Sequence, residues 1–398
     1  MTPVHVLHLI DGLNIGGAEI LLRDLTAGLV QRGYRVSVGY STSGPLADEF
    51  AASGLHLTHL PRIARIDPIL LFGMFRLMRF DPPQVVHTHL FKSDFHGRLA
   101  ARLAGVPVVV STLHNADVWA QRWPLGALYG ATARFADKLI AVSDEVRQYH
   151  IARTGIPAGK VTVIENGVDV RRFGRMQAEG SVMRAQSKGW KVRTEFGIGQ
   201  ESVVFGIIGR LKPQKDHVTF LKAAAEVLRQ IPSARFLVVG DGPLRAELEM
   251  LAGELGLFPA LVFTGQRSDI PAVLAALDVL VFSSRWEGLP VTLLEGMAAS
   301  KPVVATAVDG IKGVTLPDLT ALLVPADDFS ALAGACLKLA VDPDLRSRMG
   351  RAGLERVLAC YSLEAMIDKT AGLYNSLLLA RGLGESIPKI SAGLGATL

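Results

Sequence analysis

The alternation of short apolar segments with segments of helical periodicity limits the fold of this chain most strongly. Val4–Ile10 has the composition of a strand, and a loop containing Gly16 and Gly17 follows it. Ala18–Val30 then places apolar residues at helical spacing, and Arg35–Tyr40 has the pattern of a second strand. A strand, glycine loop, helix and strand in this order predict a parallel sheet of the α/β class.

The same pattern occurs in two series that are separated by an aperiodic region. The first series continues with strand candidates at 55–60, 84–88, 107–112, 138–142 and 161–164. The second has strand candidates at 203–208, 234–239, 261–264, 279–282 and 302–305. We therefore expect five segments: a first α/β domain at 1–170, a basic linker at 171–200, a second α/β domain at 201–360, a helix at 361–381 able to cross back to the first domain, and a tail at 382–398.

Composition excludes several classes of protein. The 398 residues suffice for two domains with separate cores, and the two cysteines, Cys336 and Cys360, form no spaced metal or disulfide framework. We see neither a signal peptide nor an apolar run of about 18 residues, so we expect a cytoplasmic protein. Of the net charge of +5, residues 171–194 contribute seven Lys/Arg against one acid. A nucleic-acid-binding protein would spread basic residues over a whole face, so this local excess does not indicate one.

The stretch Ser283–Ser300 combines two glutamates with the expected start of a helix. It follows the apolar strand candidate 278–282, and Pro290 suits the first helical position because it has no N–H to lose. A helix N-terminus favours an anion, and the carboxylates of Glu287 and Glu295 are acceptors for hydroxyl groups. This combination suits a nucleotide sugar, although two solvated acids on a helix remain the simpler interpretation.

Two cations follow the first strand of the second domain. Arg210 and Lys215 lie in GRLKPQKDH, directly after Gly209. Arginine offers a planar fork and lysine a point charge for phosphate oxygens. The alternative is a pair of solvated loop cations.

The first domain supplies glycines and histidines at strand ends. Gly16 and Gly17 precede a helix and allow close approach of a phosphate, or serve only a tight turn. No GxGxxG fingerprint is present at this loop, which disfavours a nicotinamide enzyme. His114 ends a strand where ligands of α/β sheets bind. His87 and His89 end another strand, but we identify no third ligand and expect no metal.

Several motifs resemble those of the retaining glycosyltransferases of family 4. EGLPVTLLE, residues 287–295, resembles the signature EGxPxxxxE, and GRLKPQKDH resembles the motif GRLxxxKG/D. VVGDGPLR (238–245), VFTGQRSDI (262–270) and ENGVD (165–169) resemble further landmarks of the family. The resemblance implies the GT-B fold: two facing Rossmann-like domains with parallel sheets and a cleft between them.

The resemblance also implies a role for each matching residue. Arg210 and Lys215 are expected at the donor diphosphate, Glu287 and His114 at the donor sugar, and these four form the catalytic set. The expected donor-binding residues are Gly16, Gly17, Gly209, Gly265, Gly288, Leu289, Pro290 and Glu295, with Glu295 on the ribose. Neither a metal nor a cofactor is implied.

One position departs from the family pattern. After the strand PVVAT the family commonly has GG and then a glutamate, whereas this chain has Asp309, Gly310 and Gly313. This departure puts in doubt one contact that the resemblance implies, either between the domains or with a ligand.

The leading hypothesis is a retaining transferase that moves a sugar from a UDP- or GDP-linked donor to a carbohydrate or lipid-linked acceptor, in polysaccharide or glycolipid synthesis. The alternatives are a nucleotide-sugar-binding protein without turnover, and another GT-B enzyme such as an epimerase or phosphorylase.

The segment Pro68–Phe80 joins large apolar residues to Arg76 and Arg79. It predicts peripheral contact with an anionic membrane, unless it is an ordinary core helix.

Overall fold

The computed structural model describes residues 3–64, 67–116, 118–121, 123–173, 188–384 and 388. The chain forms two compact units: an N-terminal unit of Met1–Asn166 with Leu363–Leu398, and a C-terminal unit of Gly167–Ser362. Most of the expected basic segment 171–194 lies outside the described residues.

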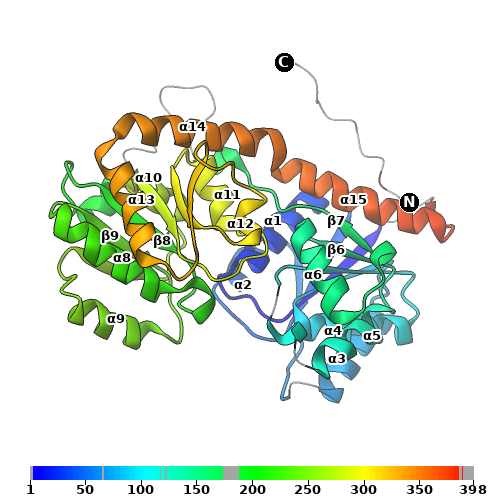
Figure 1. The fold of residues 1–398 in the computed structure, drawn as a ribbon. Helices are drawn as coiled ribbons and strands as arrows, with labels where there is room; N and C mark the ends of the chain where they lie inside the picture. Colours follow the sequence, from blue (N-terminus) through cyan, green and yellow to red (C-terminus); the bar gives the residue numbers. More distant parts are fainter. Residues whose placement is uncertain are drawn as a thin grey trace, which may run out of the picture. The chain divides into compact units, whose positions relative to one another are not determined.

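The N-terminal unit is built on a seven-stranded sheet in the order β3-β2-β1-β4-β5-β6-β7, with all neighbours parallel. Figure 1 shows this unit in blue to blue-green, with its last helix, from the end of the chain, in red. Its strands are β1 (His5–Ile10), β2 (Arg35–Tyr40), β3 (His56–His59), β4 (Val85–His89), β5 (Val108–Leu113), β6 (Lys138–Ala141) and β7 (Val161–Val163). The central strands β1, β4 and β5 are buried throughout their length, as expected for a sheet covered on both faces.

The N-terminal unit's helices connect these strands and cover the sheet. They are α1 (Gly17–Gln31), α2 (Leu46–Ala52), α3 (Pro68–Phe80), α4 (Phe91–Ala104), α5 (Leu125–Ala133), α6 (Asp144–Thr154) and, from the end of the chain, α15 (Leu363–Ala380), with short 3-10 turns at Val118–Gln121 and Ala158–Lys160. Local sequence defines several helix ends. Asp67 accepts hydrogen bonds from the backbone N–H groups of Ile69 and Leu70 at the start of α3, and Gly105 ends α4 with φ +77°.

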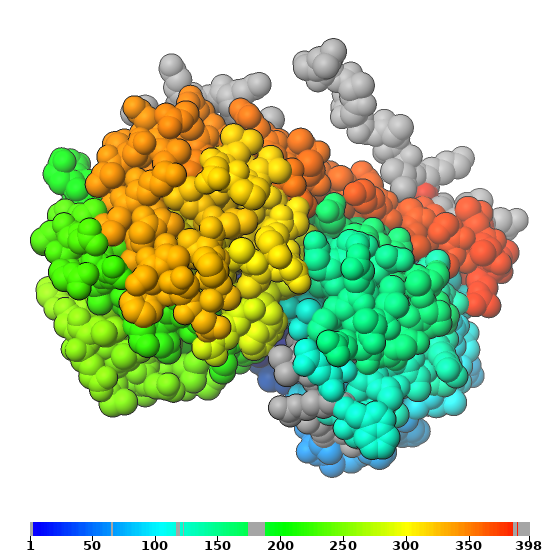
Figure 2. Space-filling model, in the orientation of Figure 1, coloured from blue at the N-terminus to red at the C-terminus, as the bar shows by residue number. Residues whose placement is uncertain are grey.

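Helix α15 packs on α1 and on the sheet of the N-terminal unit. A Cβ on Gly28 would lie 2.2 Å from Cδ1 of Ile367, so the small residue in α1 permits close contact between the helices. The Tyr34 hydroxyl donates to the Asn375 side chain at 2.6 Å, and Arg32 pairs with Glu364 and Asp368. Figure 2 shows α15 as a red ridge on the surface of this unit.

The C-terminal unit contains a six-stranded sheet in the order β10-β9-β8-β11-β12-β13, again entirely parallel. Its strands are β8 (Val204–Ile208), β9 (Arg235–Val239), β10 (Leu261–Gly265), β11 (Val279–Phe282), β12 (Val303–Thr306) and β13 (Ala321–Val324). Its helices are residues 188–195, α8 (His217–Gln230), α9 (Arg245–Glu254), α10 (Ile270–Ala276), α11 (Val291–Ala298), α12 (Asp309–Lys312), α13 (Phe329–Val341) and α14 (Pro343–Cys360), with 3-10 turns at Val170–Phe173 and Pro213–Lys215.

In each sheet, the strand order reverses at the first strand of the unit. In the N-terminal unit β1 lies between β2 and β4, and in the C-terminal unit β8 lies between β9 and β11. At such a point the loops after the two central strands diverge and leave a crevice at the carboxyl ends, where doubly wound sheets bind ligands. The α/β class and the two Rossmann-like parallel sheets predicted from the sequence are confirmed.

Candidate active site

In the C-terminal unit, the loops that follow β8 and β11 meet in an ion pair. Lys215 ends the short turn after β8, and Glu287 follows β11. Lys215 Nζ lies 2.5 Å from Glu287 Oε1, and the side chains are only 19% and 5% exposed. Two of the four residues predicted to be catalytic are therefore in direct contact in this unit.

Further polar side chains hold Glu287 in place. The Ser284 hydroxyl donates to Glu287 Oε1 at 2.6 Å, and Gln214 Nε2 lies 3.4 Å from Glu287 Oε2. Gln214 also joins the two loops, because its side chain donates to the Trp286 carbonyl at 3.0 Å and its own carbonyl accepts from Arg285 N at 2.9 Å. Sequence reasoning missed Gln214 and Ser284, although both lie beside predicted site residues.

The backbone at Asp216 fixes the position of Lys215. Asp216 has φ +46°, a left-handed conformation that is uncommon for a residue other than glycine. Its carboxylate accepts from Thr219 at the start of α8, and the Ser283 hydroxyl donates to the carbonyls of Lys215 and Asp216 at 2.9 and 2.8 Å. Hydrogen bonds from Thr219 and Ser283 therefore fix this strained turn, and the Lys215 side chain is directed toward the β11 loop.

Arg210 lies apart from this pair. It is exposed, and its guanidinium has no ion-pair or hydrogen-bond partner among the described residues. Next to it, a Cβ on Gly209 would approach Lys215 Cε to 3.3 Å, and a Cβ on Gly240 (φ +132°) would lie 2.1 Å from the Gly209 carbonyl oxygen. These glycines permit close packing of the β8 and β9 loops, whereas Gly265 (φ +73°) serves the turn after β10.

Helix α11 begins one residue later than the sequence predicted. Pro290 is the N-cap, with φ −71° and ψ 121°, and Val291 is the first helical residue. Proline lacks an N–H, so it is compatible with both the N-cap and the first helical position. Glu295 lies inside α11 and is 3% exposed, and Gly288 and Leu289 are buried beside Glu287.

The departure at Asp309 has a structural explanation. A Cβ on Gly310 would lie 2.2 Å from the Gly288 carbonyl oxygen and 2.5 Å from that of Glu287. Glycine is therefore required at 310, where α12 contacts the site loop. Asp309 is exposed and pairs with Lys312 at 3.0 Å, so a side chain fits at 309 without disturbing the loop.

In the N-terminal unit, Gly16 and Gly17 form the start of α1. Gly16 is the N-cap and Gly17 the first helical residue. A Cβ on Gly16 would lie 2.4 Å from Glu19 Oε2, so a carboxylate of the chain already lies beside this helix end. A phosphate that binds at this turn must displace that carboxylate.

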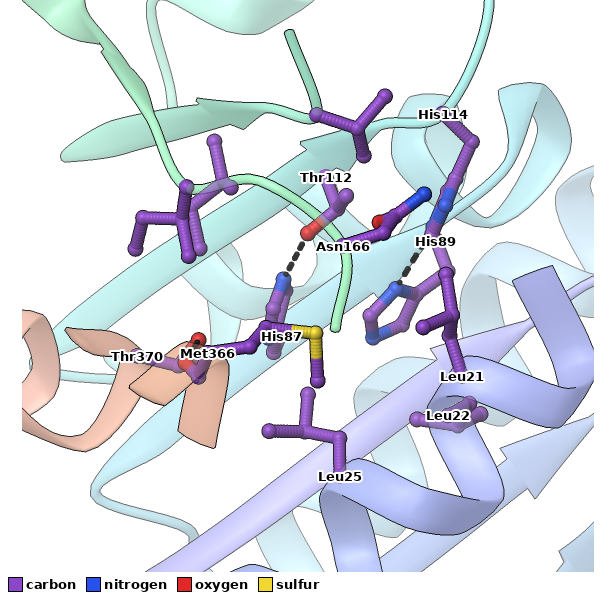
Figure 3. A pocket seen from close by; sticks show the side chains of 13 residues that line it. Leu21, Leu22, Leu25, His87, His89, Thr112, His114, Asn166, Met366 and Thr370 are labelled. Atoms are coloured by element: carbon purple, nitrogen blue, oxygen red, sulfur yellow. Dashed lines mark hydrogen bonds between the residues drawn. The ribbon is translucent and has the colours of Figure 1, made fainter. Parts of the chain in front are cut away.

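His114 follows β5 and is half-buried beside the buried rings of His87 and His89 (Figure 3). Its Nε2 lies 3.1 Å from His89 Nδ1, and burial lowers the pKa of His114 to about 4. His87, His89, Thr112 and His114 line one side of a small cavity of about 30 Å³, and its other walls are largely apolar and come from α1, β6 and α15. This volume holds one or two water molecules.

The structure supplies a third histidine that the sequence did not identify. His8, in β1, lies beside His87 and His89, with one ring nitrogen from each of the three within 4.8 Å of the others. The register of β1 and β4 brings them together, since His8 pairs with His87. Only strand pairing, which is not visible in the sequence, carries this information.

Two family models match the two units. The model of glycosyl transferases group 1 matches residues 189–356, and that of Glycosyltransferase Family 4 matches residues 15–172.

Curated relatives match most of the chain. The UDP-Gal:alpha-D-GlcNAc-diphosphoundecaprenol alpha-1,3-galactosyltransferase of Escherichia coli is 29% identical over 350 residues, 85% of this chain and 88% of the relative. The 2-deoxystreptamine glucosyltransferase of Streptomyces kanamyceticus is 30% identical over 303 residues, 70% of this chain and 74% of the relative.

Solved structures share the fold. HepE of Anabaena, in complex with UDP and glucose, superposes with a TM-score of 0.84 at 21% identity and covers 94% of this chain and 100% of its own. WaaG, a glycosyltransferase involved in lipopolysaccharide biosynthesis, superposes with a TM-score of 0.73 at 18% identity, over 93% of this chain and 99% of its own. These structures show the fold, and the two family models and the relatives of up to 30% identity show that the chain belongs to the glycosyltransferases of family 4 and group 1 and transfers sugars.

Proposed function

We propose that this enzyme transfers a hexose from a UDP-linked donor, or from a GDP-linked one, to an acceptor hydroxyl with retention of the anomeric configuration. The observation that carries the proposal is the Lys215–Glu287 pair at the point where the C-terminal sheet reverses. It puts a cation for a diphosphate and an acceptor for sugar hydroxyls within one ligand's reach. The Escherichia coli relative and the Anabaena structure, whose names include UDP-Gal and UDP, favour uridine as the base.

Arg210 and Lys215 neutralise the leaving diphosphate in this proposal. As the bond from the sugar C1 to the diphosphate oxygen breaks, negative charge develops on that oxygen, and preorganised cations stabilise it. Arg210 is exposed and can donate hydrogen bonds to phosphate oxygens. Lys215 leaves Glu287 and pairs with the diphosphate instead. Glu287 is then released to accept hydrogen bonds from the hexose, while Glu295 accepts from the ribose.

The acceptor oxygen attacks C1 on the face that the diphosphate leaves. The leaving phosphate oxygen takes the proton of the acceptor hydroxyl as the new bond forms, so bonds and protons balance without a protein nucleophile. His114 and the Gly16–Gly17 turn contribute contacts to the donor from the N-terminal unit. The proposal requires neither a metal nor a cofactor for this step.

Product stereochemistry tests the proposal against another GT-B chemistry. A thermal-shift panel of UDP, GDP and their sugars first identifies the donor, since a ligand at 100 times its dissociation constant stabilises by about 2.7 kcal/mol. Proton NMR of the product then reports the anomeric configuration. An α-linked product from an α-linked donor supports the proposal, whereas inversion, epimerisation or phosphorolysis contradicts it.

We further propose that the acceptor is lipid-linked and that α3 touches an anionic membrane on the cytoplasmic side. Leu70, Met74 and Met78 form the buried face of α3. Its other face exposes Phe72 and Phe80 (59% and 92%), together with Ile69, Arg76 and Arg79. Figure 2 shows this segment in light blue at the outer surface of the N-terminal unit. Apolar and basic residues on one exposed helix face suit a lipid interface.

Co-sedimentation with vesicles tests the membrane proposal. No helix of the described residues is long and apolar enough to cross a membrane. We expect the protein to sediment with anionic vesicles at low salt, and Phe72→Ser with Phe80→Ser to abolish this. The control Val341→Ser removes an equally exposed apolar residue of the C-terminal unit and should change nothing. Failure of the unaltered protein to sediment with anionic vesicles would instead indicate a soluble acceptor.

A further inference from the structure

A row of polar side chains crosses one face of the N-terminal sheet. His8 in β1 pairs with His87 in β4, and His89 is two residues further along β4. Side chains two residues apart on a strand share a face, so all three rings lie on the same side of the sheet. Thr112 pairs with His89 on the next strand, and His114 follows at the strand end.

Two direct hydrogen bonds join three of these rings into a chain. His8 Nδ1 lies 3.0 Å from His89 Nε2. His89 Nδ1 lies 3.1 Å from His114 Nε2, and Figure 3 shows this second bond. His87 is not part of this chain, because its nitrogens contact the hydroxyl groups of Tyr374 and Thr112. The histidine chain therefore runs from the sheet interior, at His8, to the candidate site, at His114.

Each ring of the histidine chain is neutral at pH 7. Burial lowers the pKa of His8 to about 3 and that of His114 to about 4, and burial with the neighbouring rings lowers the pKa of His89 well below its usual value. A neutral imidazole carries one N–H and one acceptor nitrogen. The two hydrogen bonds then allow only two proton orders: all three rings carry hydrogen on Nδ1, or all three carry it on Nε2.

The buried end of the chain decides between these orders. His8 is fully buried, and its Nε2 has no hydrogen-bond partner. A buried N–H without a partner is rarer in proteins than an acceptor with a free lone pair. The order with hydrogen on Nδ1 leaves only a lone pair at His8 Nε2 and is therefore favoured.

We propose that His89, backed by His8, is a positioning residue that holds His114 as a hydrogen-bond donor through Nδ1. The His114 Nδ1 has no hydrogen-bond partner among the described residues, so its N–H remains available to a ligand. Such a donor recognises an oxygen acceptor, which a hexose hydroxyl or ring oxygen provides. This ligand assignment rests on the proposed function, whereas the proton order does not.

A metal ion held by His8, His87 and His89 is the competing use of the cluster. A metal needs one lone pair from each ring directed at a single point. His8 Nδ1 and His89 Nε2 already bond each other directly, and both ring nitrogens of His87 contact hydroxyl groups. The hydrogen-bonded chain is therefore the arrangement that the geometry favours.

Long-range proton–nitrogen NMR on histidine-labelled enzyme tests the proton order without any ligand. Dialysis against EDTA precedes the measurement, and single substitutions assign the signals. We expect the Nδ1–H form at His8, His89 and His114, the reverse of the form that predominates in free histidine. The Nε2–H form or a mixture at His114 would overturn the proposal. So would displacement of the three signals by one equivalent of zinc.

A substitution then connects the proton order to recognition of the sugar. His89→Phe keeps a ring of similar size but leaves His114 Nε2 without its partner. We expect the Nε2–H form to appear at His114, kcat/KM for the donor sugar to fall about tenfold, and affinity for the nucleoside diphosphate to stay unchanged. His89→Gln, which retains a donor and an acceptor, should recover part of this loss.

His5→Phe is the matched control, because His5 is a buried histidine of β1 whose ring bonds Ser37 outside the chain. It should leave both the His114 signal and the sugar-dependent step unchanged. Equal kcat/KM losses in His5→Phe and His89→Phe would overturn the positioning role. If the enzyme transfers no sugar at all, the proposed function fails while the spectra still decide the proton order.

Discussion

At the scale of residues, the pairing of Lys215 with Glu287 is the main feature of the C-terminal unit. The two groups stabilise each other at 2.5 Å with little exposure to water. Removal of one partner leaves the other charge buried and unpaired, which lowers the free energy of unfolding. We propose that the donor, which carries both a diphosphate and hydroxyl groups, replaces Glu287 at Lys215 and Lys215 at Glu287 when it binds.

Loss of either proposed phosphate cation should slow catalysis while the fold survives. We expect Arg210→Ala and Lys215→Ala each to reduce turnover by about two to three orders of magnitude, as for removal of one preorganised charge donor. Lys222→Ala is the control, because Lys222 is an exposed lysine of α8 beside Phe329. Wild-type rates in the Arg210 and Lys215 variants would exclude these residues from the diphosphate site.

The two glutamates should separate sugar from nucleotide recognition. Glu287 lies in the loop against Lys215, and Glu295 lies inside α11. Glu295→Gln should weaken binding of the nucleoside diphosphate itself, whereas Glu287→Gln should mainly weaken the effect of the attached sugar. Calorimetry with the diphosphate and with the complete donor measures both quantities. Equal losses of diphosphate affinity in the two variants would refute this division of roles.

The sequence predicted individual site residues where a motif contained them, and missed those that only the fold brings together. Lys215 and Glu287 were identified from separate motifs 72 positions apart. Gln214 and Ser284, which hold Glu287, belong to no pattern of their own. The partnership of His8 with His89 depends on strand register, which periodicity does not reveal.

At the scale of elements, the contact between α12 and the β11 loop leaves no space for a side chain at Gly310. Gly310→Ala would force a Cβ to within 2.2 Å of the Gly288 carbonyl oxygen, so the backbone of the site loop must move. We expect a loss of about 1 to 3 kcal/mol in the free energy of unfolding and a fall in turnover. Urea unfolding and a sugar-transfer assay measure the two effects.

Gly334→Ala is the control for this substitution. Gly334 lies in α13, and a Cβ there would meet nothing within 4 Å. Alanine in a helix interior should stabilise by about 0.5 to 1 kcal/mol. A Gly310→Ala variant that gains stability in the same way would show that the close contact is not needed.

Sequence periodicity located most strands within one or two residues, because glycines, prolines and polar clusters mark their ends. Arg35–Tyr40 and Val279–Phe282 match their predicted bounds. The strand candidates of the second series ended at 302–305 and did not include β13, Ala321–Val324. The start of α11 was misplaced by one residue, because proline is compatible with both the N-cap and the first helical position.

At the scale of the whole molecule, buried histidines make stability depend on pH. Burial lowers the pKa of His5, His8, His87, His89, His114 and His150 in the N-terminal unit, and of His217 in the C-terminal unit. A depressed folded-state pKa means that the unfolded chain binds more protons below pH 6.5. The free energy of unfolding should therefore fall as the pH drops from about 6.5 toward 4, by about 1.4 kcal/mol per pH unit for each histidine that stays neutral.

The N-terminal unit should consequently unfold first on acidification. Urea unfolding at pH 7.5, 6.5 and 5.5, followed by hydrogen exchange in each unit, measures the order of loss. We expect the N-terminal unit to lose protection well before the C-terminal unit as the pH falls. Equal sensitivity of both units between pH 6.5 and 5.5 would show that the buried histidines do not control this dependence.

Acceptor-dependent release of nucleoside diphosphate distinguishes a sugar transferase from a binding protein. The purified enzyme is incubated with UDP- and GDP-sugars, alone and with lipid-diphosphate-linked and free sugar acceptors, and the released diphosphate and glycosylated product are quantified. We expect one donor to yield equal amounts of released diphosphate and glycosylated product, only when an acceptor is present, and Lys215→Ala to reduce both by about two to three orders of magnitude. Tight binding of a nucleotide sugar without any release, in the presence of every acceptor, would exclude this transfer and identify a binding protein without turnover.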